Sequence, residues 1–466
     1  MRILRTCGRF RLSSFLGLMG AAALVPACSS DGGGGGGGGA AFVPPAPFAV
    51  ALSTGGPDRL MAATAGPGGS FYAAGYSAAG PSDPKQVVVV KILPTGSLDA
   101  TFGTGGVAVT GLVFTPGAGD GADEIDVAVQ STGKIVVSAT VAAGGSAPAG
   151  DTDVAVARLN ADGTVDSSFG TAGVLSLSLN EALDDGGPVG KDGSRALAID
   201  PTDDRIYLHA FQRNEGATRT DTDFAVVRVT ADGAPDTSFG GGDGKFVLDI
   251  GEANATPRAL AVLSDRSVLA SGYANTGGGA QPVLYRLTSS GDLVESFAVG
   301  GVYHHAVLAV QTEIYGFAVH GTALVTAGYG RETGSRNDWV SLRFHTGSGD
   351  RDLDWGGSSI GAVLINPSPN PAVGSNCRSA VGLPGGKTIL LGSTGTSPTR
   401  KAVFAVLAAD GTLDPAYGAA PHLVPFGANT DDQFWGGALS GTQALLVGWR
   451  VSSGSEDAYA LLLPVQ

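Results

Sequence analysis

The chain has 466 residues, of which 75 are glycine and 43% are hydrophobic, while only 15% are charged. This composition leaves enough apolar surface for a large core and excludes both a collagen-like chain and a wholly disordered one. The net charge of −14 disfavours nucleic acid and anionic lipid as partners, because both would repel a polyanion.

The first residues have the features of an export signal. Four arginines among the first eleven residues precede a short apolar run, Ser13 to Val25, and then Pro26-Ala-Cys28. We interpret residues 1–27 as a signal peptide, since the apolar run is too short to span a membrane. Ala27 followed by Cys28 resembles a bacterial lipoprotein processing site, in which the cysteine becomes the lipidated N-terminus. The alternative is an ordinary secreted protein that is cut near Ala27.

Residues 28–47 read as a tether between this lipid and the folded body. Eight glycines, Gly32 to Gly39, precede a proline-rich stretch, and such sequences behave as flexible coil. We therefore expect an exported protein of the bacterial cell envelope, held at the outer membrane or cell surface only by lipid on Cys28. Cys7 leaves with the signal, so Cys377 is the one thiol left and no internal disulfide can form.

A repeated stretch organises the rest of the chain. Asp166-Ser-Ser-Phe-Gly-Thr-Ala-Gly173 recurs as Asp99-Ala-Thr-Phe-Gly-Thr-Gly-Gly106 and as Asp236-Thr-Ser-Phe-Gly240, and worn copies begin at residues 295, 354 and 414. Each unit also holds short β-branched runs separated by Gly, Asp and Asn turns, which are hairpin signals. Four antiparallel strands per unit, repeated, predict the blades of a β-propeller.

The two ends of the repeat predict how the ring closes. Three strand-like runs between Trp435 and Leu463 follow the sixth copy, but no seventh copy follows them. Phe48-Ala-Val-Ala-Leu52, ahead of the first unit, resembles an orphan fourth strand. We predict one all-β domain, residues 48–466, that is a seven-bladed β-propeller whose last blade is completed by the N-terminal strand. Closure of this kind removes exposed strand edges.

These units resemble a known family. The hairpin Ala161-Asp-Gly163, the signature after it and the run Gly133-Lys-Ile-Val-Val137 are similar to the delta-60 repeats of bacterial proteins. The resemblance covers roughly residues 59–425 and fades after residue 290. It implies repeated β-units in a propeller, and it implies no catalytic residues.

The signature residues have structural roles available to them. Arg158 and Arg228 lie on strands whose two alternating sets of residues are both apolar, so a charge there needs a partner. The acid that opens each signature, eight residues later, is the expected partner, and the aromatic is expected to fill space between blades. The structural set is Asp99, Phe102, Arg158, Asp166, Phe169, Arg228, Asp236 and Phe239.

Calcium is the functional alternative for some of these acids. Asp162 to Asp166, Asp410 to Asp414 and Gly117 to Glu124 offer oxygen ligands, but turn capping explains the same aspartates more simply. We therefore expect no cofactor or metal, with calcium as the alternative. The sequence also contains no nucleophile elbow, phosphate loop or zinc-ligand spacing, so no catalytic residue is assigned.

Variable loops gather at the face opposite the short hairpins, and such loops are the usual place for recognition. The candidate binding rim on this face is Arg213, Arg219, Arg331, Arg336, Trp339, Arg400 and Lys401.

Two functions fit these features. The leading hypothesis is a monomeric, lipid-tethered, non-catalytic scaffold that binds a protein or glycan at the rim. The alternative is a propeller hydrolase that acts on an extracellular or cell-wall polymer in the central channel. An enzyme should bring several carboxylates or histidines together at the channel, whereas a binder should have a broad, shallow rim.

Overall fold

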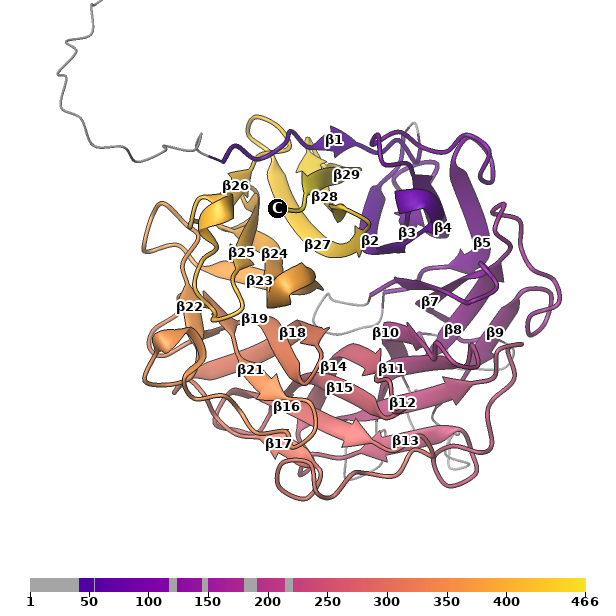
Figure 1. Ribbon diagram of the computed structural model, residues 1–466. Helices are drawn as coiled ribbons and strands as arrows, with labels where there is room; N and C mark the ends of the chain where they lie inside the picture. Colours follow the sequence, from indigo (N-terminus) through magenta and orange to yellow (C-terminus); the bar gives the residue numbers. More distant parts are fainter. Residues whose placement is uncertain (1–41, 54, 117–123, 145–149, 180–190, 214–220) are drawn as a thin grey trace, which may run out of the picture. The chain divides into compact units, whose positions relative to one another are not determined.

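The computed structural model describes residues 42–466, apart from residues 54, 117–123, 145–149, 180–190 and 214–220. The predicted signal peptide, Cys28 and the glycine run therefore lie outside the described residues. The described chain forms seven antiparallel sheets that follow one another around a ring, as Figure 1 shows. The predicted seven-bladed β-propeller is confirmed.

The first four blades follow the chain from the axis outward. Blade 1 is β2 (Asp58–Ala65), β3 (Phe71–Ser77), β4 (Gln86–Ile92) and β5 (Val107–Val113). Blade 2 is β6 (Asp126–Val129), β7 (Ile135–Ala142), β8 (Thr152–Leu159) and β9 (Val174–Leu177). Blade 3 is β10 (Asp192–Ile199), β11 (Ile206–Arg213), β12 (Thr222–Val229) and β13 (Lys245–Leu248). Blade 4 is β14 (Asn254–Val262), β15 (Val268–Asn275), β16 (Ala280–Leu287) and β17 (Val302–His304).

The remaining blades depart slightly from this plan. In blade 5 the third strand is broken in two, so that its elements are β18 (Gln311–His320), β19 (Ala323–Arg331), β20 (Asp338–Ser341), β21 (Arg343–His345) and β22 (Val363–Ile365). Blade 6 is β23 (Ser375–Gly382), β24 (Thr388–Thr394), β25 (Lys401–Leu407) and β26 (His422–Val424). Short 3₁₀ turns lie at Pro67–Gly69, Trp355–Gly357, Pro384–Gly386 and Pro415–Tyr417. Among the described residues, no helix is long and apolar enough to cross a bilayer.

Blade 7 closes the ring as predicted. Its strands are β27 (Asp431–Ser440), β28 (Gln443–Ser452), β29 (Ser455–Pro464) and, as the fourth, β1 (Phe48–Ala49) from the other end of the chain. Phe48 pairs with Ala460 and Ala49 with Tyr459, and the register continues where Val50 N donates to Ala458 O at 2.9 Å. This pairing gives the edge of β29 a partner.

The hydrophobic core lies between neighbouring blades. Strands such as β3 are buried along their whole length, because a blade covers each of their faces. The signature aromatic of each unit, at positions 102, 169, 239, 297, 355 and 417, is at most 2% exposed. Burial of a side chain this large stabilises the fold by roughly 2–3 kcal/mol.

The aromatic packs beneath the hairpin of the next blade. A Cβ on Gly233 would lie 2.9 Å from the Phe169 ring, and the φ of +86° at Gly233 also favours glycine. At the same place Gly170 N donates to Asp232 O at 3.1 Å. Gly163, Gly291, Gly349 and Gly411 meet the preceding aromatic in the same way. At the ring closure the ring of Phe48 lies close to the position a Cβ on Gly96 would take.

The expected ion pairs lie beside these aromatics. Arg158 Nε is 2.7 Å from Asp166 Oδ2, and both side chains are less than 10% exposed. The Arg158 guanidinium also lies 4.8 Å from the Phe169 ring centroid and donates from Nη1 to Ala231 O of the next blade at 2.5 Å. Burial alone would raise the pKa of Asp166, but hydrogen bonds from Lys134 and Ser168 and the charge of Arg158 hold it well below the usual range.

The other units keep the interaction, and the worn ones do so with altered partners. Lys91 pairs with Asp99 at 2.8 Å and Arg343 with Asp352 at 2.6 Å. In blade 6, where Val406 replaces the basic residue, Asp414 pairs instead with Lys387 at 2.7 Å. Arg286 pairs with Asp265. The charge pair is therefore retained even where one partner lies in the turn between the first and second strands of the blade.

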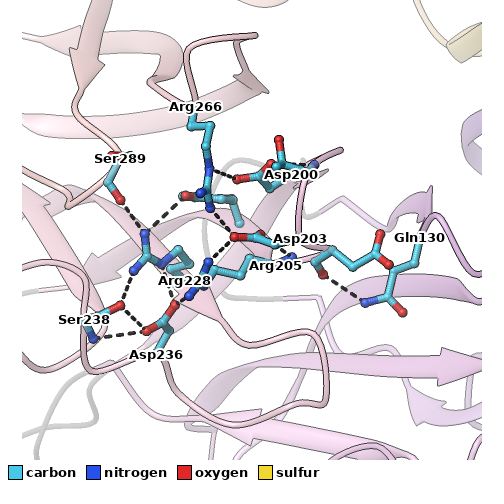
Figure 2. Close-up of polar contacts among 12 residues, drawn as sticks. Gln130, Asp200, Asp203, Arg205, Arg228, Asp236, Ser238, Arg266 and Ser289 are labelled. Atoms are coloured by element: carbon cyan, nitrogen blue, oxygen red, sulfur yellow. Dashed lines mark hydrogen bonds and ion pairs between the residues drawn. The ribbon is translucent and has the colours of Figure 1, made fainter.

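Blade 3 extends this pair into a network, which Figure 2 shows. Asp236 accepts from Arg228 at 2.7 Å and from Arg205 at 2.8 Å. Arg205 also contacts Asp203, and Asp203 contacts Arg266 of blade 4. The network therefore connects the hairpin ends of two adjacent blades.

We expect the substitution Asp166→Ala to destabilise the protein by about 3 kcal/mol, because it leaves the buried Arg158 charge without its main partner. The measurement is the midpoint of thermal and denaturant unfolding. Asp232→Ala is the matched control, since Asp232 lies 3.7 Å from the same arginine but is 89% exposed. Equal effects of the two substitutions would contradict the assigned role of the buried pair.

Candidate functional site

The inner strands carry a shared irregularity at the axis. Each of six of them has a register shift that leaves one residue without a partner on the second strand, which is a β-bulge. Bulges turn a side chain away from the regular alternation and are common beside active sites. The bulged residues are Met61, Arg195, Arg258, Tyr315, Arg378 and Trp435.

These residues line one small cavity of about 150 Å³, to which all seven blades contribute. Blade 2 supplies two carboxylates, Glu124 and Asp126, at the start of its inner strand. The lining residues therefore include three arginines, two acids and three aromatic residues. We refer to it as the axial cavity.

Arg258 and Glu124 form an ion pair across the axial cavity. Arg258 Nη1 lies 3.0 Å from Glu124 Oε1, and Arg258 Nη2 donates to Tyr273 Oη at 3.2 Å. The Arg258 guanidinium lies 4.0 Å from the Tyr315 ring centroid. Burial raises the pKa of Glu124, and the charges of Arg258, Arg195 and Arg378 oppose that rise.

Asp126 has a different environment, although it lies only two residues away. Its Oδ1 accepts from Val127 N and its Oδ2 from Leu197 N, both at 2.8 Å. Burial raises the pKa of Asp126 to about 7; the two N–H groups oppose the rise and the charge of Glu124 adds to it. A carboxyl group with this pKa can both give and take a proton near neutral pH.

Arg378 is held by aromatic rings. Its guanidinium lies 4.5 Å from the centroid of Tyr315, 4.6 Å from that of Trp435 and 5.8 Å from that of Tyr329. Such contacts attract a cation to the ring face and position it without neutralising its charge.

A chain of tyrosines supports this wall. Tyr315 Oη lies 2.8 Å from Tyr329 Oη and 3.4 Å from Tyr273 Oη. Burial raises the pKa of Tyr315 well above its usual value and that of Tyr329 likewise, so both hydroxyls keep their protons. Burial also raises the pKa of Glu313 behind them.

The residues of the candidate rim do not gather into one site. Arg400 bonds both oxygens of Asp431, at 2.7 and 2.9 Å, and Lys401 donates to Thr430 O at 2.7 Å. These two residues therefore join blade 6 to blade 7. Arg213 lies at the end of β11, and Arg219 lies outside the described residues.

Arg331 and Arg336 lie together beside a second cavity of about 390 Å³ in blade 5. Arg336 pairs with Asp338 at 2.6 Å, and Arg331 donates to Asn337 Oδ1 at 3.3 Å. The prediction that Trp339 belongs to the rim is wrong, because its side chain is 0% exposed and packs in the core between blades 5 and 6. It lies on a strand that the neighbouring blades cover, so it cannot form part of a rim.

The acids considered for calcium have other partners. Asp162 Oδ1 accepts from Thr164, and Asp410 Oδ1 accepts from Thr412, both as turn caps. Residues 117–123 lie outside the described residues. In the described part of the chain, Asp221, Asp223 and Asp249 are close enough to share a cation, but each already takes part in another interaction. Cys377 is buried, and burial raises the pKa of its thiol.

The axial cavity was missed in the sequence. Arg195-Ala-Leu-Ala198 and Arg258-Ala-Leu-Ala261 are the signal that marks it, since the same four residues recur within the first strand of two units. The bulge that turns each arginine toward the axis leaves no mark in the alternation of apolar residues. The pattern therefore predicts a strand at these positions and no site.

Comparison with known proteins agrees with the propeller. The family model described as "Domain of unknown function (DUF5122) beta-propeller" matches residues 130–169 and 216–239. No curated protein matches the sequence. Among solved structures, the polysaccharide lyase Uly1 is similar with a TM-score of 0.49 and 11% identity over 85% of this chain and 88% of that one.

Other solved structures give weaker similarity. A polysaccharide lyase described as a PL25 ulvan lyase has a TM-score of 0.46 and 12% identity over 89% of this chain and 94% of its own. The Hadza microbial sialidase Hz136 has a TM-score of 0.42 and 11% identity, over 82% and 73% of the two chains. All three are named as enzymes that act on glycans, at identities that establish no more than the fold.

The prediction of a non-catalytic scaffold with a binding rim is corrected. The ionisable groups of this chain converge at the axis, which is the arrangement expected of the alternative, an enzyme, and not of a broad binding rim. The physical reason is that the loops hold paired or isolated charges, whereas the bulges bring charges from several blades together. This chain is a β-propeller repeat protein whose axial cavity holds ionisable groups from several blades.

The raised pKa of Asp126 predicts a pH-dependent cost to stability. The folded protein holds a proton on Asp126 up to about pH 7, whereas the unfolded chain loses it near pH 4. The contribution of Asp126 to the free energy of unfolding is therefore fully present below about pH 4. It is lost as the pH rises to about 7. We expect Asp126→Asn to become more stable relative to the native protein between pH 5 and pH 8, by about 2 kcal/mol. Parallel unfolding curves at the two pH values would contradict this assignment.

Proposed function

We propose that this protein is an enzyme that cleaves an extracellular or cell-wall glycan by acid–base hydrolysis in the axial cavity. The observation that carries this proposal is the pair of unlike carboxyl groups, Glu124 and Asp126, on one wall of the cavity. Paired carboxyl groups are the catalytic machinery of most glycoside hydrolases. Groups whose environments differ in this way can take the separate roles of acid and base.

Asp126 fits the role of general acid. Its pKa of about 7 leaves a large fraction protonated near neutral pH. Protonated Asp126 would donate its proton to the glycosidic oxygen as the bond from that oxygen to the anomeric carbon breaks. The sugar that leaves keeps this proton as part of its new hydroxyl group. The hydrogen bonds from Val127 and Leu197 fix the direction of the carboxyl group, which proton transfer requires.

Glu124 fits the complementary role. Burial raises the pKa of Glu124, and its ion pair with Arg258 opposes that rise by favouring the ionised form. An ionised carboxylate beside the anomeric carbon stabilises the positive charge that develops there, and it can activate the water molecule that completes hydrolysis. Water then supplies a hydroxyl group to the anomeric carbon and a proton that restores the acid. The protein's own side chains therefore supply both the general acid and the carboxylate that activates water.

The walls of the cavity are suited to holding one sugar unit. The lining combines the aromatic residues Tyr315 and Trp435 with polar groups beside them, which is the combination found in small-molecule sites. The cavity is smaller than the roughly 300–1,000 Å³ of a typical ligand site. It therefore fits one unit or one substituent of a polymer that lies across the end of the propeller.

The proposal extends to the place of action and to the repeat family. The basic and apolar residues before Cys28 support export and lipid attachment, which would bring the enzyme to polymers outside the cell. The signature and hairpin residues support membership of the delta-60 repeat family.

Hydrolysis is tested by incubating the protein with hyaluronan, alginate, polygalacturonate, xylan and cellulose and measuring new reducing ends. We expect release from at least one polymer, with kcat falling as the pH rises through about 7, because the acid form of Asp126 is required. Asp126→Asn should lower kcat by at least about 100-fold. Asp232→Ala, far from the cavity on an exposed hairpin, should leave kcat unchanged.

Two results would contradict the proposal. One is full activity of Asp126→Asn, which would remove the general acid from the mechanism. The other is a product with a double bond that absorbs near 232 nm, since this would show elimination in place of hydrolysis.

Lipid attachment is tested separately in cells fed with labelled palmitate. We expect the native protein to take up the label and to sediment with membranes. Cys28→Ser should lose the label and move to the soluble fraction, while Cys377→Ser, which changes a buried thiol, should keep it. Label on the Cys28→Ser protein would contradict the assignment.

A further inference from the structure

Arg195, Arg258 and Arg378 all line the axial cavity. The acids near them are Glu124, which Arg258 engages, Asp126, which carries less than a full charge near neutral pH, and Glu313, which interacts with Arg258 and Arg378 from behind the wall. Burial raises the pKa of all three carboxyl groups, so together they carry less negative charge than the three guanidinium groups carry positive charge. An excess of cations in a partly desolvated cavity favours an anion from outside.

Arg378 has the clearest capacity for such an anion. Within the part of the chain that the structure describes, no carboxylate or carbonyl group accepts a hydrogen bond from it, and its Nε is buried without a partner. Its contacts there are with the faces of Tyr315, Trp435 and Tyr329. Ring faces hold the plane of the guanidinium but use none of its N–H groups, so these groups remain available to a ligand.

The arrangement differs from that of the signature arginine Arg158. Arg158, for example, also lies over an aromatic ring, but its N–H groups bond Asp166 and Ala231 O. The N–H groups of Arg158 have acceptors within the protein. Those of Arg378 are oriented by the aromatic rings but have no acceptor among the described residues. A guanidinium in this state binds carboxylate and sulfate oxygens well, because its donors form a fixed fork.

We propose that the axial cavity selects acidic sugars and that Arg378 binds the carboxylate or sulfate substituent. This inference rests on the proposed function and names the substrate class of the same site. The volume of about 150 Å³ suits one substituted sugar ring. Both substituents present oxygen atoms to the same N–H groups, so carboxylate and sulfate are two forms of one chemistry.

Binding is tested by isothermal titration of the native protein with glucuronate, with N-acetylglucosamine 6-sulfate and with glucose. None of these monosaccharides has a glycosidic bond to be cut, so the titration measures recognition without catalysis. We expect at least one acidic sugar to bind at least 10-fold more tightly than glucose. Binding of glucuronate alone identifies a carboxylate site, and binding of the sulfated sugar alone identifies a sulfate site.

The role of Arg378 is tested with Arg378→Met, which keeps a long apolar stem, and with Arg378→Lys, which keeps the charge but loses the fork. We expect the affinity for the acidic sugar to fall at least 10-fold in the methionine variant and less in the lysine variant. Arg336→Met removes an exposed arginine that pairs with Asp338, and it should leave binding unchanged. If the methionine variant does not fold, the lysine variant provides the comparison.

Equal affinity for glucose and both acidic sugars would overturn the inference, and so would native affinity in both Arg378 variants. Neither result would affect hydrolysis itself, because cleavage of a neutral polymer would still be detected as reducing ends. Conversely, acidic sugars that bind through Arg378 without cleavage of any polymer would support this inference and contradict the proposed function.

Discussion

The contact between each signature and the next blade is the interaction on which the rest of the structure depends. An aromatic ring lies under the hairpin glycine of the following blade, and a basic residue beside it reaches a carbonyl group of that hairpin. Because the basic residue is buried, it needs the signature acid as its counter-ion. Burial, charge pairing and close backbone approach therefore depend on one another. At the ring closure Phe48 approaches Gly96, so the N-terminal strand supplies an aromatic there as well as backbone hydrogen bonds.

Different parts of each blade therefore provide stability and carry the side chains of the axial cavity. The signature contacts hold the blades at a constant spacing, and the bulges at the axis then carry side chains that the fold does not prescribe. Met61, Tyr315 and Trp435 show that the bulged position accepts apolar and aromatic residues as readily as arginine. A position with such freedom on a rigid frame is where a repeat protein can acquire a site without altering its core.

The fold could be predicted from local features, whereas the site could not. The repeated Asp-x-Ser-Phe-Gly stretch, the Asp-Gly hairpins and the missing seventh copy each lie within one unit or at the chain ends. The order of residues alone therefore predicts the blades and the ring closure. Glu124 and Arg258, by contrast, meet only because the ring brings blades 2 and 4 to a common axis. Trp339 was misplaced for a related reason, since proximity to a variable loop in the sequence does not show whether neighbouring blades cover the strand.

The charge distribution links these observations to the proposed substrate. The whole chain is acidic, with a net charge of −14, yet the axial cavity contains three guanidinium groups. An acidic polymer would be repelled by the surface at long range and attracted by the cavity at short range. Salt screens exposed charges over roughly 8–10 Å but affects partly buried ones much less. Moderate salt should therefore weaken the repulsion between the acidic surface and an anionic polymer more than the attraction at the axial cavity.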